Sequence, residues 1–147
     1  MNERQQQLNQ ALEAMFFGFK TLVKKPDEDL ARLGYTHIHH RILYFVGRNA
    51  DCSVNELLNI LEVSKQYLNR PLKRLQQDGY ISSRIDSKDR RIRRLRLTQR
   101  GEQFEQKLSS QQRERFARVF QQLGPQAEQH WREVMQMLAE EEAETGD

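Results

Sequence analysis

The sequence predicts a mainly α-helical fold with one small β-hairpin. Apolar residues recur at helical spacing over most of the 147 residues, and two short neighbouring segments each begin with a helix-capping residue. Only residues 80–85 and 93–97 alternate as strands do. A chain of this length fits one domain or a compact pair of domains with a buried core.

The first expected helix covers roughly residues 4 to 24, and Pro26 is expected to end it. Its apolar residues at helical spacing are Leu8, Leu12, Met15, Phe16, Phe19 and Leu22. The cluster from Met15 to Phe19 is unusually apolar for a terminal helix of a monomer. We therefore favour packing against a partner chain over packing on the protein's own core.

Three shorter helices are expected next. Residues 36–49 place Ile38, Ile42, Phe45 and Val46 on one face. Residues 53–56, Ser-Val-Asn-Glu, match a capping box, and Ser64 is the N-cap of the following helix, which ends at residues 78–79. Only two residues separate the last two helices, so they must cross at a steep angle, as in a helix-turn-helix.

The positive charge is concentrated around the hairpin. The formal net charge is +3, but residues 64–96 carry +8, with eleven basic and three acidic residues, and the remainder carries −5. Such a concentration indicates a polyanionic partner. The helix and the hairpin together predict a winged helix-turn-helix that binds double-stranded DNA.

The helix that begins at Ser64 is expected to read DNA, with Leu68, Leu72 and Leu75 on its inner face. Its predicted DNA-binding residues are Ser64, Lys65, Gln66, Tyr67, Asn69, Arg70, Lys73 and Arg74. We expect Gln66, Asn69 and Arg70 to reach base edges. Lys65, Lys73 and Arg74 are expected on phosphates, with added hydrogen bonds from Ser64 and Tyr67. Pro71 should kink this helix or loosen it locally.

The hairpin, or wing, is stronger evidence for DNA binding than the helix, because its arginines repel one another unless a polyanion is bound. Its predicted DNA-binding residues are Arg84, Lys88, Arg90, Arg91, Arg93 and Arg94. Asp86 and Asp89 are expected to be structural: each can accept hydrogen bonds from nearby backbone amides, and Asp89 can also hold Arg91 in one rotamer. After the wing, Thr98 caps a long helix that is interrupted at residues 124–125 and followed by a last helix.

Three segments of this sequence resemble the wing region of the MarR (multiple antibiotic resistance regulator) transcriptional regulators: residues 78–81 (Asp-Gly-Tyr-Ile), 86–91 (Asp-Ser-Lys-Asp-Arg-Arg) and 97–101 (Leu-Thr-Gln-Arg-Gly). The resemblance implies a homodimer bound to a pseudo-palindromic operator, acting as a repressor and released by a small molecule or an oxidant. It divides the chain into an N-terminal dimerisation helix with its connection (1–33), a winged helix-turn-helix (34–98) and C-terminal dimerisation helices (99–147).

The resemblance also implies that Arg90 or Arg91 enters the minor groove, and the choice between them stays open. Arg93 and Arg94 depart from the family, where these positions are usually apolar. This wing is therefore either more deeply engaged with DNA or packed differently on its own domain. Effectors in the family often lie between the dimer helices and the DNA-binding core. The corresponding candidates here are Phe16, Phe19, Lys20, His39, Arg41 and Tyr44, which equally suit an ordinary helix interface.

Other classes of function are disfavoured. The sequence contains no phosphate-binding glycine loop and no nucleophile elbow, so an enzyme is not expected, nor is a cofactor. His37, His39 and His40 do not form a metal-ligand pattern, and the single Cys52 is expected to be a small buried residue. With no apolar run for a membrane span or a signal peptide, we expect a cytoplasmic protein. The alternative function is a non-specific architectural DNA-binding or protein-interaction winged helix.

Overall fold

The computed structural model describes residues 1–144 and the side chains of residues 1–140. In chain order these residues form α1 (Glu3–Ala31), α2 (His37–Arg48), β1 (Cys52–Ser53), α3 (Val54–Leu61), α4 (Lys65–Gln77), β2 (Ile81–Ile85), β3 (Arg93–Leu97), α5 (Gln99–Leu123) and α6 (Pro125–Glu144). The last three residues of the expected region 99–147 lie outside the described part. The chain divides into two units, Met1–Gln111 and a second that begins at Gln112, within α5.

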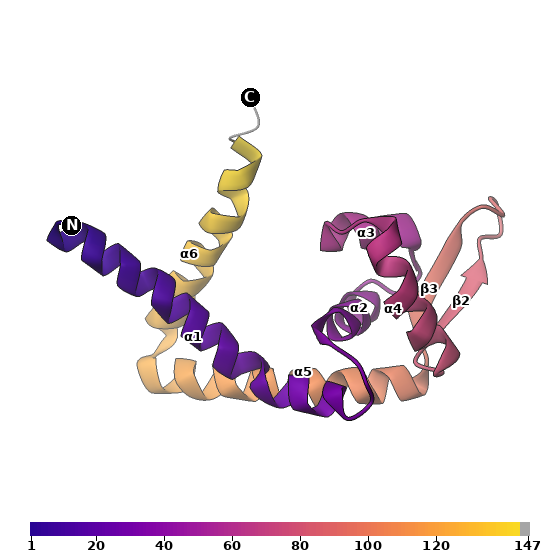
Figure 1. Cartoon of the computed structure of the whole chain (residues 1–147), viewed down its shortest axis with the longest axis horizontal. Coiled ribbons are helices and arrows are strands. Elements are labelled where there is room, and N and C mark those ends of the chain that lie inside the picture. The colour runs from indigo at the N-terminus through magenta and orange to yellow at the C-terminus, as the bar shows by residue number, and fades with distance from the viewer. Residues whose placement is uncertain (145–147) are drawn as a thin grey trace. The chain divides into compact units, whose positions relative to one another are not determined.

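α1 is longer than predicted, because the helix continues through Pro26 to Ala31. The prediction that Pro26 ends it is wrong. A proline inside a helix costs one backbone hydrogen bond, but Pro26 and Leu30 are both buried, and their burial stabilises the last two turns. The N-terminal part of the helix, drawn in indigo in Figure 1, extends away from α2, α3 and α4, and its side chains are exposed as far as Thr21.

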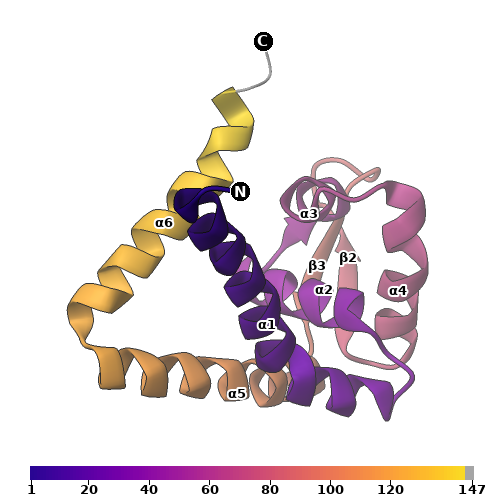
Figure 2. The same ribbon diagram turned by 60° about the vertical axis from the view of Figure 1, so that its left-hand side comes forward.

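The two helices of the predicted helix-turn-helix are α3 and α4, which lie close to α2 in both views (Figures 1 and 2). The Ser53 hydroxyl accepts the Glu56 amide at 3.0 Å, and the Glu56 carboxylate accepts the Ser53 amide at 3.4 Å, which confirms the capping box. Glu62 ends α3 in the left-handed conformation, with φ of 54°. The Ser64 hydroxyl then accepts the Tyr67 amide at 3.1 Å and starts α4, which continues through Pro71 without interruption.

The sheet has three antiparallel strands in the order β1-β3-β2. β2 and β3 form the predicted hairpin, in register from Ile81 opposite Leu97 to Ile85 opposite Arg93. The sequence did not predict β1, in which Cys52 pairs with Leu95, because two residues are too few to show strand alternation. Ile85 is 54% exposed, since the hairpin projects beyond the core (Figure 1).

The core of the first unit lies where α2, α3 and α4 meet the base of the sheet. Its fully buried side chains are Leu30, Ile42, Leu43, Val46, Leu57, Leu75, Leu95 and Leu108. Cys52 is 4% exposed, as predicted, and burial raises the pKa of its thiol. One core thus joins the inner face of α4 to α1, to α5 and to the base of the wing.

The start of α5 is tied to the base of the wing. The Thr98 hydroxyl donates to the Gly79 carbonyl at 2.6 Å and accepts the Gly101 amide at 3.0 Å, so it caps the helix as predicted. A Cβ on Gly101 would lie 2.0 Å from the Tyr80 carbonyl oxygen. Only glycine allows the helix to approach the start of the strand this closely. These contacts explain the threonine and the glycine of the Leu-Thr-x-x-Gly motif.

The second unit contains the end of α5 and α6, joined at Gly124 with φ of 98°. Phe116, Phe120 and Trp131 form an aromatic cluster with ring centroids 5.0 to 5.8 Å apart. Several apolar side chains of this unit remain exposed, namely Val119, Leu123, Val134, Met137 and Leu138. No helix in the described part of the chain has the length and apolar character needed to cross a membrane.

Candidate nucleic-acid interface

The outer face of α4 presents a row of polar side chains to solvent. Leu68, Leu72 and Leu75 bury the opposite face, so the helical repeat leaves Lys65, Gln66, Tyr67, Asn69, Arg70 and Lys73 exposed. These side chains offer donors and acceptors suited to base edges and cations suited to phosphates. The Ser64 hydroxyl oxygen accepts the helix-capping bond, which leaves its hydrogen available for an outside acceptor.

Arg74 lies differently from the other predicted residues of α4. Its guanidinium donates to the backbone carbonyls of Leu33 at 2.6 Å and Gly34 at 2.8 Å. It also lies 4.7 Å from the centre of the Tyr35 ring, and its Nε is 3.6 Å from a carboxylate oxygen of Asp78. The Tyr35 hydroxyl donates to the same carboxylate. Arg74 therefore joins α4 to the connection between α1 and α2.

A groove of about 550 Å³ separates the recognition helix α4 from the wing. Its walls come from α4, the wing and the start of α3, and its lining includes Lys65, Asn69, Lys73 and Gln76 of α4, Arg91, Ile92 and Arg93 of the wing, and Ser53 and Asn55. Sequence reasoning missed Asn55 and Gln76. Neither carries charge, and no local motif distinguishes them from other polar surface residues.

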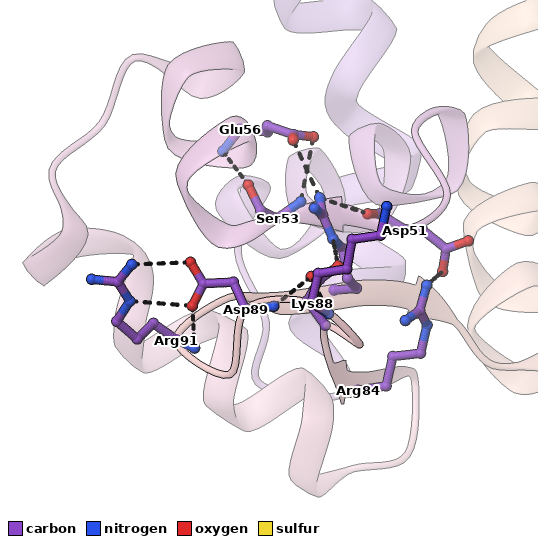
Figure 3. A network of polar contacts seen from close by, with 9 residues as sticks. Asp51, Ser53, Glu56, Arg84, Lys88, Asp89 and Arg91 are labelled. Atoms are coloured by element: carbon purple, nitrogen blue, oxygen red, sulfur yellow. Dashed lines mark hydrogen bonds and ion pairs between the residues drawn. The ribbon is translucent and has the colours of Figure 1, made fainter.

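The wing turn is organised by two aspartates, Asp86 and Asp89, and Figure 3 labels Asp89 together with Lys88 and Arg91. One carboxylate oxygen of Asp86 accepts the backbone amides of Lys88 and Asp89, each at 3.0 Å. Asp89 accepts the backbone amide of Arg91 at 3.0 Å and two guanidinium donors of the same residue at 3.1 and 3.2 Å. These hydrogen bonds lower the pKa of both carboxyl groups. The largest effect on the pKa of Asp86 comes from the backbone amide of Asp89, and the largest effect on the pKa of Asp89 comes from the Arg91 side chain.

The cations of the wing fall into two groups. Lys88, Arg90 and Arg93 are exposed, and the Arg91 side chain is 91% exposed although Asp89 holds it. Arg84, Arg94 and Arg96 are paired with carboxylates: Arg84 and Arg96 with Asp51, and Arg94 with Asp86 at 3.2 Å and Glu56 at 3.3 Å. The sequence did not identify Asp51 and Glu56 as partners, because they lie far along the chain from the wing.

The candidate effector residues do not lie in one environment. Phe16, Phe19 and Lys20 are exposed on α1, and Arg41 is exposed on α2, where Tyr44 is half-buried. His39 is buried, stacked on Tyr35 with ring centroids 4.6 Å apart, and its Nδ1 accepts the Thr36 amide at 3.0 Å. Burial lowers the pKa of His39.

The remaining histidines and the cysteine show no metal-binding arrangement. His40 Nε2 lies 3.1 Å from the Ser109 hydroxyl, and His37 is exposed. Among the described residues, no group of three or more histidine, cysteine or acidic side chains lies close enough together to hold a metal ion.

A recognition helix and a basic wing on opposite sides of one groove define a winged helix-turn-helix protein of the DNA-binding class. The model of the MarR family matches residues 33–92. The HTH-type transcriptional regulator PetP of Rhodobacter capsulatus is 38% identical over 133 residues, which cover 90% of this chain and 80% of that protein. The chain therefore belongs to the MarR family of DNA-binding transcriptional regulators.

Solved structures show the same fold. The MarR family transcription regulator SP03579 superposes with a TM-score of 0.79 at 22% identity, covering 96% of this chain and 93% of its own. NadR, in complex with 4-hydroxyphenylacetate, gives a TM-score of 0.67 at 22% identity, covering 95% of this chain and 94% of its own. The winged helix-turn-helix architecture predicted from the sequence is thereby confirmed.

Proposed function

We propose that the protein is a sequence-specific transcriptional regulator that binds a pseudo-palindromic operator as a homodimer. The observation that carries this proposal is the groove between α4 and the wing. Exposed basic and amide side chains from both of these elements line it. In each half-site α4 enters the major groove, where Gln66, Asn69 and Arg70 read base edges. Lys65 and Lys73 bind the flanking phosphates, with hydrogen bonds from Ser64 and Tyr67.

The wing reaches the adjacent minor groove with its exposed cations. Arg90 and Arg91 are the candidates for insertion, and Lys88 and Arg93 bind the phosphates beside them. Arg91 is already held in one rotamer by Asp89, so it loses little side-chain entropy on binding. In this arrangement residues 34–98 make the DNA contacts.

The regions 1–33 and 99–147 supply the dimer contacts. Leu12, Phe16 and Phe19 on α1 are each more than half exposed, and such a cluster is costly on a soluble surface unless a partner covers it. In the second unit, Val134 and Leu138 are exposed on α6 with four-residue spacing, which suits helix-on-helix packing. A second copy of the chain offers the same faces and closes them by two-fold symmetry.

We propose further that the dimer represses transcription and that a small molecule ends repression. Cys52 is buried with a raised pKa, so it is poorly suited to sensing oxidants as a thiolate. NadR has been solved with the aromatic acid 4-hydroxyphenylacetate, which makes small organic acids the first class of effector to test. The candidate residues at which to look are Phe16, Phe19, Lys20, His39, Arg41 and Tyr44.

The experiment is selection of bound sites from a random duplex library, with the selected sites read for two-fold symmetry. Recovery of one palindromic motif supports the proposal. Equal recovery of unrelated sequences, with strong salt dependence, would contradict it and support an architectural DNA-binding role instead. A reporter carrying the selected site then tests repression, and its release is tested with a panel of aromatic acids.

A further inference from the structure

Arg94 lies at the base of the wing, and its side chain is only 24% exposed. Its Nε donates to Asp86 at 3.2 Å, and its Nη1 donates to Glu56 at 3.3 Å and to the backbone carbonyl of Asp51 at 3.5 Å. The three partners belong to the wing turn, to the first turn of α3 and to the segment before β1, and Figure 3 labels the last two, Glu56 and Asp51. One guanidinium therefore joins the wing to the helix-turn-helix.

Each partner of Arg94 organises a further part of the domain. The second oxygen of Asp86 accepts the amides of Lys88 and Asp89, which shapes the turn that carries the wing-tip cations. The second oxygen of Glu56 accepts the Ser53 amide and so closes the capping box of α3. A shift of Arg94 would consequently alter the angle between the wing tip and the two helices.

The charge around Arg94 argues against a role in binding phosphate. Two carboxylates already face its guanidinium, so a phosphate that approached it would also meet the negative charges of Asp86 and Glu56. Arg93, its neighbour on β3, is exposed and lines the groove beside α4. Successive residues of a strand point to opposite sides, which separates the roles of the two arginines.

We propose that Arg94 is a positioning residue for DNA recognition, which sets the wing at a defined angle to α4 and does not contact the DNA backbone. This inference rests on the proposed operator binding through α4 and the wing. It follows that Glu56, an acidic residue of α3, increases operator affinity by helping to hold Arg94 in place. Removal of an acid near bound DNA ordinarily strengthens binding, so the sign of that effect is diagnostic.

The test compares Arg94→Lys and Glu56→Gln with the matched control Arg96→Lys, at an arginine of the same strand that pairs with Asp51, in the full-length protein. Lysine keeps the positive charge, but its donors all sit on one nitrogen. It therefore lacks the fixed fork with which the guanidinium reaches Asp86 through Nε and Glu56 through Nη1. Glutamine at position 56 preserves the capping box, because either Glu or Gln serves there. The measurements are the Kd for the selected operator, the Kd for an unrelated duplex, the salt dependence of each Kd and the thermal unfolding midpoint.

We expect Arg94→Lys and Glu56→Gln each to weaken operator binding by about fivefold, a loss typical of partly exposed charge pairs. The Kd for the unrelated duplex and the salt dependence should stay unchanged, and Arg96→Lys should bind as the original protein does. Unchanged operator binding by Arg94→Lys, or tighter binding by Glu56→Gln, would overturn the proposal. So would an equal loss for both duplexes, since that is the result of a lost phosphate contact or of a general structural defect.

Hydrogen exchange of the free protein separates this inference from the proposed function. Faster exchange of the Lys88 and Asp89 amides in Arg94→Lys than in Arg96→Lys is expected whether or not an operator exists. Equal exchange in the two variants would refute the link between Arg94 and the wing turn. If the wing loosens in Arg94→Lys while the original protein selects no duplex sequence, the operator model fails and the link stands.

Discussion

The guanidinium of Arg74 donates a hydrogen bond to the backbone carbonyl of Gly34 at 2.8 Å, joining residues 40 positions apart in the chain. A second bond reaches the Leu33 carbonyl, and both acceptors belong to the chain just after α1. Gly34 has φ of 73°, and a Cβ there would lie 3.1 Å from Arg74 Nη2. The recognition helix is thereby attached directly to the end of the helix proposed to form the dimer interface.

Replacing Arg74 should loosen this attachment. We expect Arg74→Met to lower the free energy of unfolding by about 1 kcal/mol, because two carbonyls lose a charged donor at a partly exposed site. The salt dependence of DNA binding should not change. Urea unfolding and salt titrations check both statements. Lys73→Ala is the matched control, with little effect on stability and a salt slope reduced by about one. A reduced salt slope in Arg74→Met would instead place Arg74 on a phosphate.

Arg70 and Lys73 should differ in what their loss does to sequence preference. Arg70→Ala is expected to weaken operator binding by about 1 to 3 kcal/mol and to relax selection at one base position, as removal of a base contact does. Lys73→Ala should weaken all duplexes alike. Binding to a set of single-base operator variants measures the difference. Equal effects of the two substitutions on every sequence would contradict the assigned roles.

Gly101 should tolerate no side chain. In Gly101→Ala the added Cβ would lie 2.0 Å from the Tyr80 carbonyl oxygen, so α5 or the wing base must shift. We expect a loss of about 3 kcal/mol in the free energy of unfolding, at the upper end for an overpacked site. Gly18→Ala, where no atom lies within 4 Å of the added Cβ, is the control and should change stability by less than about 1 kcal/mol. Equal unfolding midpoints would refute the close approach.

Acid should destabilise the first unit through two histidines, the buried His39 and the half-buried His40. Burial lowers the pKa of His39 and of His40 below the ordinary value of 6.5. As pH falls below 6.5, the unfolded chain therefore binds protons at these positions before the folded chain does, and the free energy of unfolding decreases.

The measurement is thermal unfolding between about pH 7.5 and about pH 5.5. His39→Gln should reduce the pH dependence, because Gln at this position keeps the capping box with Thr36 but does not titrate. His37→Gln, at an exposed site of the same helix, is the control. An unaltered pH dependence in His39→Gln would show that His39 is not responsible.

Phe16 should matter for self-association rather than for folding. It is 62% exposed on α1, so Phe16→Glu is expected to leave the unfolding of the monomer unchanged. The dimer dissociation constant should rise by about tenfold or more, since a charge replaces an aromatic contact. Sedimentation equilibrium measures the change, and Gln10→Glu controls for added charge on the same helix. Unchanged self-association would exclude this face of α1 from the dimer interface.

Much of the first unit could be predicted because its decisive contacts are local. Ser53, Ser64 and Thr98 each accept an amide three residues ahead, so each helix start is readable in a few letters. The amides that Asp86 accepts are two and three residues away. The periods of 3.6 and 2 likewise place Leu68 and Leu95 in the core without any knowledge of their neighbours.

Periodicity places a side chain on a face but does not say where a long side chain ends. Arg70 and Arg74 are both exposed on α4, and the sequence assigned both to DNA. The guanidinium of Arg74 folds back onto Leu33 and Gly34, which a helical wheel does not contain. Arg93 and Arg94 differ in the same way, because only Arg94 has Glu56 within reach.

Residues a few positions apart in the chain specify every element type except that of β1, together with the caps, the wing turn and the concentration of positive charge. Only the folded chain shows that α1 continues through Pro26, that β1 joins the sheet and that Arg74 and Arg94 bind within the domain. Each of these outcomes depends on burial or on partners 38 to 43 positions away. Contacts that form only when the chain folds stabilise these features, so the local sequence contains no pattern that predicts them.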